Sequence, residues 1–512
     1  MAAQLNPGPA GVSLRVLVVG GGLAGIATAF ALQRAGHAVT VLERSESAST
    51  PGDGGLRSPP NMTRILNHWG LAPRLALSAV KCPQFRFHQA DGDLLAIVQL
   101  HDDFLRDLMA DFVFVRHRDL HEMLLELAVQ AGVRVRWGAV VKAVDCDSLS
   151  VTLDDGSGSG GEENLHADLV VGADGPNSVV RSAVVGPGVD VPGVRDGHMS
   201  LMVTIPTKLM QADEDLRPLC EDDSCWLWLG PNTLFYGSLV AARTQFSIVI
   251  GLRSVPPAVL ARYSDGEDWD PSRTRTYPIE EFGIDWGKYD VRVQKLVPFM
   301  RAVTPTVHVR RPILESSVCE RARVVLVGEA AHPVMPAGQH NAALGIEDAE
   351  TLGALFAHVQ TRAQVPRVLG AYEELRVGRC GYAQDWELRK RTMLTCAPGA
   401  AQEARDARLR RIMAYGDWEH MDEERFREMW GDEMEMFTYN STEKVADWWT
   451  KWGWLLVREG ADGAGGVGGA AAGGRYGDRL GVRVPMRPSL EVRTFVPRLL
   501  VFLVSRFLER EN

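Results

Sequence analysis

The chain has 512 residues, of which 46% are hydrophobic and 23% are charged, so it is long enough for several domains with a large buried core. Its formal net charge of −10 excludes a general nucleic-acid-binding protein, which would carry a basic face. No run approaches the roughly 18 apolar residues of a membrane-spanning helix, and we expect no signal peptide in residues 1–13.

The seven cysteines are scattered through the chain and form no CxxC pair. An odd, scattered set of this kind indicates reduced thiols rather than a disulfide framework or a cysteine metal site. We therefore expect a reducing compartment, the cytoplasm, and we predict no metal ligands.

A strand, a tight turn, a helix and a second strand are predicted at the start of the chain. Residues 14–19 form a nearly continuous apolar run, which is typical of a strand buried on both faces. An Ala- and Leu-rich helix is predicted at 26–35, ending at Gly36, and a second strand at 39–42. This order predicts an α/β fold with a Rossmann-like parallel sheet.

The turn between the first strand and the helix has the spacing GxGxxG. Gly20 permits the turn, Gly22 lets the backbone approach a pyrophosphate, and Gly25 lets helix and strand pack closely. Glu43 follows the second strand, where its carboxylate can accept hydrogen bonds from an adenosine ribose. The motif predicts dinucleotide binding; an ordinary strand–helix turn is the alternative.

Further along, helices are predicted at 61–69 and 118–131, strand-like stretches within 85–100, and one strand at 133–144. A buried strand at 168–172 leads into the turn Asp174-Gly175-Pro176-Asn177, after which Ser178 can cap a helix.

The pattern changes between about 197 and 310, where strand-like runs separated by turns predict a mostly antiparallel sheet. These runs are 201–205, 226–229, 234–240 and 246–252. Trp226 and Trp228 share one face of their strand, and core packing is the favoured interpretation for both.

A third turn follows the buried strand 324–327. It reads Gly328-Glu329-Ala330-Ala331-His332-Pro333 and continues through Gly338 to a helix predicted at 341–359. Residues 365–457 are predicted to be mainly helical. The low-complexity segment 459–475 is predicted to be a flexible linker. In the tail, residues 495–508 contain the apolar run 499–504 between Arg498 and Arg506; a docked helix is favoured over a weak membrane-surface anchor.

The three turns, in this order and spacing, resemble those of class A flavoprotein monooxygenases. The similarity is to the fungal salicylate-hydroxylase-like group, which shares the p-hydroxybenzoate hydroxylase fold, and it covers about residues 14–355. The resemblance implies an FAD-binding domain at 12–196 and 311–362, with a substrate-binding β-sheet lobe inserted at 197–310. A helical region at 363–458, the linker 459–475 and a tail at 476–512 complete the expected organisation.

The resemblance also implies the residues of the FAD site. They are Gly20, Gly22, Gly25, Glu43, Arg44, Gly54, Gly55, Arg118, Asp174, Gly175, Glu329, Gly338, Asn341 and Ala342. In the family, the Asp-Gly turn lies beside the pyrophosphate, and the acid corresponding to Glu329 binds the ribityl chain. The following helix points its N-terminus at the flavin pyrimidine. Arg116 is the alternative to Arg118, because the register at this point is uncertain.

Two residues, Arg57 and Tyr236, are assigned to catalysis by the same resemblance. Arg57 follows the loop that lies along the flavin in the family, and Tyr236 is the candidate polar contact to substrate from the middle sheet. His332 is expected to pack beside the flavin rather than act as a base. Two positions depart from the family pattern: Glu329 stands where Asp is usual, and His340 where Gly is usual.

The implied reaction is hydroxylation or epoxidation of a small aromatic or polyketide/terpenoid-derived compound. Tightly bound FAD would accept hydride from NADH or NADPH and react with O2 to give a C4a-hydroperoxide, whose terminal oxygen is transferred. The alternatives are a reductase or dehydrogenase of the same fold without oxygen insertion, and a non-enzymatic binding protein like the Rab GDP-dissociation inhibitors. The oligomeric state is not predicted.

Overall fold

The computed structural model describes residues 10–48, 54–154, 161–186, 193–263, 275–335, 337–414 and 423–462. Contacts divide the chain into two units, Met1–Val457 and Arg458–Asn512. Helix α14 (Ser441–Asp462) continues into the first residues of the predicted linker. The rest of the linker and the tail, including the predicted helix at 495–508, lie outside the described residues.

The N-terminal unit contains a five-stranded parallel sheet, whose strands lie in the order β18-β12-β1-β2-β8. Its strands are β1 (Arg15–Val19), β2 (Ala38–Leu42), β8 (Arg134–Arg136), β12 (Leu169–Gly172) and β18 (Val324–Leu326). The crossover between β1 and β2 is α1 (Leu23–Arg34). The predicted α/β class is confirmed, and the apolar runs that predicted β1, β12 and β18 are buried strands.

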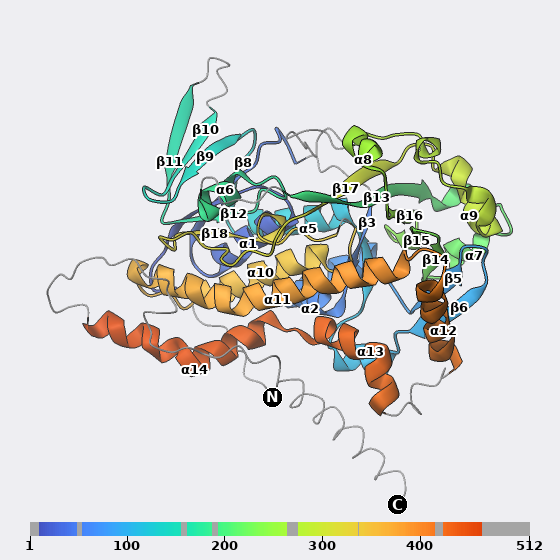
Figure 1. Ribbon diagram of the computed structural model, residues 1–512. Coiled ribbons are helices and arrows are strands. Elements are labelled where there is room, and N and C mark those ends of the chain that lie inside the picture. The colour runs from blue at the N-terminus through green and yellow to red at the C-terminus, as the bar shows by residue number, and fades with distance from the viewer. Residues whose placement is uncertain are drawn as a thin grey trace, which may run out of the picture. The chain divides into compact units, whose positions relative to one another are not determined.

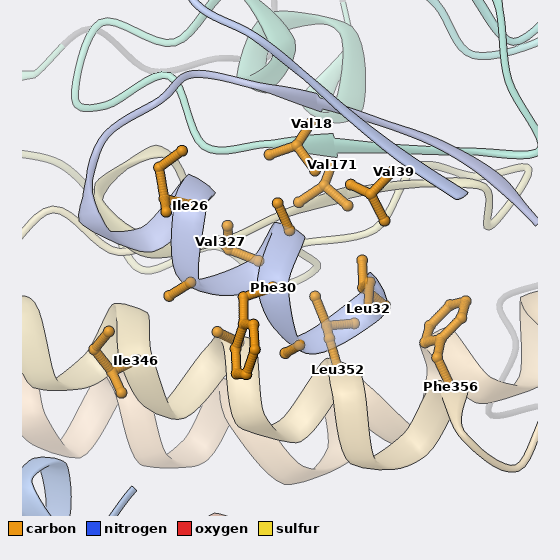
Figure 2. Close-up of a cluster of buried hydrophobic side chains, with 14 of the residues drawn as sticks. Val18, Ile26, Phe30, Leu32, Val39, Val171, Val327, Ile346, Leu352 and Phe356 are labelled. Carbon is orange, nitrogen blue, oxygen red and sulfur yellow. The ribbon is translucent and has the colours of Figure 1, made fainter. Parts of the chain in front are cut away.

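The main core lies between this sheet, α1 and α10 (Asn341–Phe356). Figure 2 shows Phe30 and Leu32 of α1 lying between sheet valines such as Val18 and the α10 side chains Leu352 and Phe356. The two helices approach closely because their facing residues are small. A Cβ added to Gly353 would lie only 2.7 Å from the Cβ of Ala31.

A seven-stranded sheet forms the second layer, in the order β17-β13-β16-β15-β14-β5-β6 (Figure 1). Its strands are β5 (Gln84–Gln89), β6 (Leu94–Gln99), β13 (Val194–Pro206), β14 (Cys225–Gly230), β15 (Thr233–Val240), β16 (Gln245–Leu252) and β17 (Thr304–Arg310). The β14–β5 pair is parallel and every other pair is antiparallel, as the sequence predicted for most of the lobe. β5 and β6 precede the predicted lobe in the sequence but complete its sheet.

Two three-stranded sheets complete the strand inventory of the described residues. One is β3 (Gly55–Ser58), β7 (Val113–Arg116) and β4 (Val80–Lys81); the other is β11 (Glu162–His166), β10 (Ser150–Asp154) and β9 (Val141–Asp145). The single strand predicted at 133–144 is therefore divided between β8 and β9. The break lies at Gly138, whose φ of +69° turns the chain.

Helices cover the sheets and make up the C-terminal region, as predicted. The shorter ones are α2 (Pro60–His68), α3 (Ala72–Ser78), α4 (Asp102–Asp107), α5 (His117–Gln130), α6 (Val179–Val185), α7 (Arg217–Glu221), α8 (Pro257–Tyr263) and α9 (Val291–Leu296). The C-terminal ones before α14 are α11 (Val365–Leu394), α12 (Ala400–Ala414) and α13 (Glu423–Thr438). None of the helices in the described ranges combines the length and apolar character needed to cross a membrane.

The long helix α11 connects the two sheets (Figure 1). Near its start, the hydroxyl of Tyr372 donates to the carbonyl of Leu326 on β18, at 3.3 Å. Near its end, Arg391 donates to the hydroxyl of Ser200 on β13, also at 3.3 Å. The helix therefore fixes the parallel sheet relative to the seven-stranded sheet, and its polar side chains lie between them.

Candidate active site

The three turns identified in the sequence lie side by side at one edge of the parallel sheet. Gly20 follows β1, Asp174 follows β12 and Glu329 follows β18, and these three strands are parallel neighbours. The carboxyl ends of parallel strands meet at one edge, which is where open α/β sheets bind ligands. The turns also touch: a Cβ on Gly20 would lie 2.4 Å from the carbonyl oxygen of Ala173.

The glycine turn has the shape of a phosphate-binding cradle. Gly20 has a φ of +104°, which only glycine adopts readily. A Cβ on Gly25 would lie 2.0 Å from the carbonyl oxygen of Gly20, so this glycine is needed for close packing. A Cβ on Gly22 would meet nothing within 4 Å, so the space before α1 is open. An open space at a helix N-terminus suits an anion such as a pyrophosphate.

Glu43 joins the end of β2 to this turn. Its Oε2 accepts a hydrogen bond from the backbone N–H of Gly21 at 2.6 Å, and its Oε1 accepts one from that of Ser45 at 2.9 Å. Oε1 also accepts from the hydroxyl of Ser45 at 2.8 Å, so Oε2 is the oxygen with a lone pair left for a ribose hydroxyl. The neighbouring side chain, Arg44, is exposed.

Helix α5 begins beside the glycine turn. Its orientation therefore indicates which arginine, Arg118 or Arg116, can approach the pyrophosphate of FAD. The ring nitrogen Nε2 of His121 lies 2.7 Å from the carbonyl oxygen of Gly21. Arg118 precedes His121 by three residues, so it lies on the same face of α5. The Arg116 guanidinium instead donates to Asp119 at 2.9 Å. The contact of His121 with the glycine turn was not predicted. Because His121 follows Arg118 by three residues in a predicted helix, the sequence could have placed both on one face.

Asp174 closes the second turn. Its carboxylate accepts hydrogen bonds from the hydroxyl of Ser178 at 2.5 Å and from the backbone N–H of Val179 at 2.8 Å, while burial raises its pKa. The next residue, Gly175, has a φ of +79°. Ser178 caps α6 as predicted, because its hydroxyl accepts from the N–H of Arg181 at 2.8 Å.

Glu329 and the start of α10 form the third part of the site. Burial raises the pKa of Glu329, and its Oε1 accepts a hydrogen bond from the side chain of Asn341 at 3.2 Å. Asn341 and Ala342 are the first residues of α10, whose early N–H groups have no partner within the helix. At Gly338 a Cβ would lie 2.9 Å from the carbonyl oxygen of Met335 and 3.0 Å from the carboxylate of Glu387, so a larger residue would force one of them to move.

The two residues predicted to be catalytic, Arg57 and Tyr236, are in direct contact. The Arg57 guanidinium donates to the Tyr236 hydroxyl at 2.9 Å and to the carbonyl oxygen of Ala337 at 2.8 Å. The Tyr236 hydroxyl donates to the same carbonyl at 2.9 Å. Burial disfavours the charge of Arg57, but Tyr236 and other groups outweigh it and raise its pKa. The contact joins β3, the seven-stranded sheet and the turn before α10.

The glycines at 54 and 55 pack against the seven-stranded sheet. A Cβ on Gly54 would lie 2.4 Å from the methyl group of Met202, and one on Gly55 would lie 2.8 Å from Val240. The N–H of Gly55 also donates to the hydroxyl of Ser247 at 2.8 Å. Their small size is therefore explained by this approach to β13, β15 and β16.

The two tryptophans of β14 lie on the opposite face of the sheet from Tyr236. Trp226 and Trp228 belong to the apolar core beneath α9, and the indole N–H of Trp228 donates to Asp290 at 3.1 Å. Tyr236 is paired with Leu227, the residue between them, so it faces the other way.

Three residues of this region were not predicted to belong to a site: His340, Glu387 and Arg391. The N–H of His340, just before α10, donates to Oε1 of Glu387 on α11 at 2.7 Å. Glu387 and Arg391 are one helical turn apart, and both are buried. The charge of Glu387 helps raise the pKa of Arg57, while burial lowers that of Arg391. The sequence did offer one signal for this group: His340 stands where the family usually has Gly, and a buried imidazole at that position needs a polar partner such as Glu387.

His332 is occupied by a structural contact. Its Nε2 lies 2.6 Å from Oδ2 of Asp348 on α10. Burial opposes a charge on the ring, but Cys380 and Asp348 outweigh it and raise its pKa well above the usual value. A protonated, paired imidazole is a poor general base.

Together, the open cradle, the partly buried acid and the N-terminus of α10 fit a flavin dinucleotide, and the fold and site define a flavin-dependent oxidoreductase. The chain belongs to the FAD binding domain family, whose model matches residues 13–380.

Curated relatives are similar over most of their length. FAD-dependent monooxygenase OpS4 of Beauveria bassiana is 26% identical over 395 residues, covering 77% of this chain and 88% of the relative. The 3-amino-4-hydroxybenzoate 2-monooxygenase PtmB3 of Streptomyces platensis is 31% identical over 367 residues, covering 71% and 84%. The protein is an FAD-dependent monooxygenase.

Solved structures show the same fold. A salicylate hydroxylase in complex with substrate matches with a TM-score of 0.63 and 19% identity, covering 85% of this chain and 97% of that one. CtdE in complex with FAD and its substrate 4 matches with a TM-score of 0.68 and 16% identity, covering 87% and 100%.

Proposed function

We propose that this monooxygenase hydroxylates or epoxidises a small, electron-rich aromatic or polyketide/terpenoid-derived compound, using O2 and either NADH or NADPH. Bound FAD supplies hydride acceptance and oxygen activation. The protein's part is to hold the cofactor, orient the substrate and exclude water. The relative PtmB3, named for an aminohydroxybenzoate, supports an aromatic substrate.

In this proposal the cofactor lies along the carboxyl edge of the parallel sheet. The α1 N-terminus binds the pyrophosphate with help from Arg118, Glu43 binds the adenosine ribose, and Glu329 binds the ribityl chain. The other proposed contacts are Gly20, Gly22, Gly25, Arg44, Gly54, Gly55, Asp174, Gly175, Gly338, Asn341 and Ala342. Support comes from the adjacency of the three turns and from the open space at Gly22.

The proposed position of the reacting centre is based on the contact between Arg57, Tyr236 and the carbonyl of Ala337. It lies where the seven-stranded sheet meets the turn leading into α10, whose N-terminus is proposed to face the flavin. On the same face of the sheet, Leu227 and Val249 offer apolar contacts for an aromatic ring. Arg57 would stabilise negative charge on a phenolic oxygen, and Tyr236 would hydrogen-bond it.

The test is to purify the protein, record its visible spectrum and screen phenolic compounds for stimulated oxidation of NADH and NADPH. The first panel contains salicylate and 3-amino-4-hydroxybenzoate. Oxygen consumption and the mass of the product are measured together. We expect yellow protein and a product heavier by one oxygen atom. Cofactor oxidation without an oxygenated product would identify the reductase alternative, and colourless protein would favour the non-enzymatic one.

A further inference from the structure

A second group of polar side chains lies on the edge pair of the seven-stranded sheet, formed by β13 and β17. The register of this pair shifts between Arg195 and Met199, where Gly197 has a φ of +82°. Such a bulge re-aims neighbouring side chains. It brings Asp196 and His198 of β13 together with His308 of β17.

The nitrogen and oxygen atoms of these three side chains that could bind a metal ion lie close together. Nδ1 of His308 lies 2.9 Å from Oδ2 of Asp196, and Nδ1 of His198 lies 3.1 Å from Oδ1. One atom from each residue falls within 4.8 Å of the others. Ligand atoms about 2.1 Å from a tetrahedral ion lie about 3.4 Å apart, so the side chains need to separate by only a few tenths of an ångström to hold one ion.

His198 lacks the partners that a buried imidazole requires. The residue is only 7% exposed, yet among the described residues neither ring nitrogen makes a well-formed hydrogen bond, although Nδ1 lies close to Oδ1 of Asp196. Leaving a buried polar group unsatisfied is costly, so each such group needs an explanation. In the described part of the chain, Asp196 forms ion pairs with the two histidines and with no lysine or arginine.

A second group of possible ligand atoms lies elsewhere in the same molecule and provides a comparison. His332, Asp348 and Cys380 also gather three ligand atoms within 4.8 Å. There the Arg376 guanidinium donates to Oδ1 of Asp348 at 2.7 Å and lies 3.5 Å from the sulfur of Cys380. A guanidinium is hydrogen-bonded to that carboxylate, whereas the carboxylate of Asp196 faces the two imidazoles and the backbone N–H of His198, and the charge of Arg391 also acts on it.

We propose that Asp196, His198 and His308 bind a divalent transition metal of the zinc class. Neutral imidazole and carboxylate are ligands that such ions prefer, and three protein ligands leave a position for water. The ion would link the bulge of β13 to the edge strand β17. None of the three residues is among the proposed flavin contacts.

The experiment measures zinc bound by the FAD-loaded protein, prepared without a histidine tag, by equilibrium dialysis against buffered Zn²⁺ and elemental analysis. We expect one zinc ion per chain and a rise in melting temperature on adding zinc. His198→Ala and His308→Ala should each weaken binding by about 10- to 100-fold or more. Asp196→Asn, which keeps the side-chain shape, should weaken it similarly and serves if the histidine variants fold poorly.

His37 provides the matched control. It is buried like His198, but its ring nitrogens lie 3.3 Å from the N–H of Leu14 and 3.2 Å from the carbonyl of Phe356. His37→Asn should bind zinc as the unmodified protein does. The proposal is overturned if the unmodified protein binds no zinc, or if the His198, His308 and Asp196 variants bind as much as the control.

Discussion

The hydroxyl of Tyr236 has two partners at once, since it accepts from Arg57 and donates to the carbonyl of Ala337, each at 2.9 Å. Tyr236→Phe removes both contacts while keeping the ring. We expect kcat/KM to fall by about 10- to 100-fold, because a hydrogen bond to a charged group contributes roughly 1.5–3 kcal/mol. The measurement is steady-state oxidation of NAD(P)H with the substrate identified in the screen.

Tyr263→Phe is the control for this change. Its hydroxyl donates to Glu281 at 3.0 Å in the other core of the seven-stranded sheet, away from Arg57. Activity should be unchanged in this variant. Equal losses in the two variants would mean that Tyr236 acts only through general stability.

We also expect the two arginines near the start of α5 to contribute differently to FAD binding. Arg118→Met should weaken FAD binding by about tenfold, or roughly 1.4 kcal/mol, and reduce its dependence on salt. Arg116→Met removes an ion pair with Asp119 and should change FAD affinity little. Reconstitution of the flavin-free protein, followed by flavin fluorescence, measures both. A larger loss in Arg116→Met would assign the phosphate contact to that residue instead.

Residues that act through local backbone geometry could be predicted from the sequence, whereas residues brought in by packing could not. Gly20 and Gly25 are recognisable because the turn itself needs them. Glu387 and Arg391 lie on a helix whose sequence shows only mixed polar and apolar residues. Their place beside Arg57 depends on how α11 crosses from one sheet to the other, which no local pattern encodes.

At the scale of elements, the contact between α1 and α10 depends on glycine at position 353. Alanine is favoured over glycine in a helix by about 1 kcal/mol. A Cβ at this position would nevertheless lie 2.7 Å from the Cβ of Ala31 and 3.0 Å from its carbonyl oxygen. Overpacking of this kind costs about 1–3 kcal/mol, so Gly353→Ala should be destabilising overall. Thermal unfolding of the FAD-loaded protein tests this expectation.

Gly378 of α11 is the matched control, because a Cβ there would meet nothing within 4 Å. Gly378→Ala should raise the free energy of unfolding by about 0.5–1 kcal/mol through helix propensity alone. If Gly353→Ala were stabilised as much as Gly378→Ala, the helices would have more room than their contact indicates.

The elements themselves were mostly predictable, because buried strands and amphipathic helices have strong patterns. The membership of strands in sheets was not. β5 and β6 were expected as strands, but nothing in residues 84–99 indicates that β5 pairs in parallel with β14. Pairing between distant segments is decided by the layers that the whole chain forms, so the domain boundaries drawn from the sequence stay a prediction.

On the scale of the whole molecule, α10 and α11 lie side by side (Figure 1). A buried ionic network joins these two helices. Arg376 donates to Glu347 and to Asp348, each at 2.7 Å, and Arg379 donates to Glu347 at 2.9 Å. Asn61 of α2 also donates to Glu347 at 2.7 Å. These side chains are almost fully buried, so removal of one partner leaves an uncompensated charge in the core.

This network predicts how stability depends on pH. Burial would raise the pKa of both carboxyls, but the neighbouring cations outweigh it and lower each pKa to about 2, from 4.5 for Glu347 and 3.8 for Asp348. The stabilisation is therefore complete above the unfolded values and is lost as the pH falls toward about 2, because the unfolded chain binds these protons first.

Arg376→Met tests whether this network holds the molecule together. At neutral pH the variant should lose about 3–5 kcal/mol of stability, since two buried carboxylates lose a partner. Its melting temperature should fall less steeply on acidification than that of the unmodified protein, because protonation relieves the buried charge. Arg74→Met is the control: its pair with Glu126 is 40% and 47% exposed, so stability and its pH dependence should stay nearly unchanged. An unaltered acid slope in Arg376→Met would show that other groups set the pH dependence.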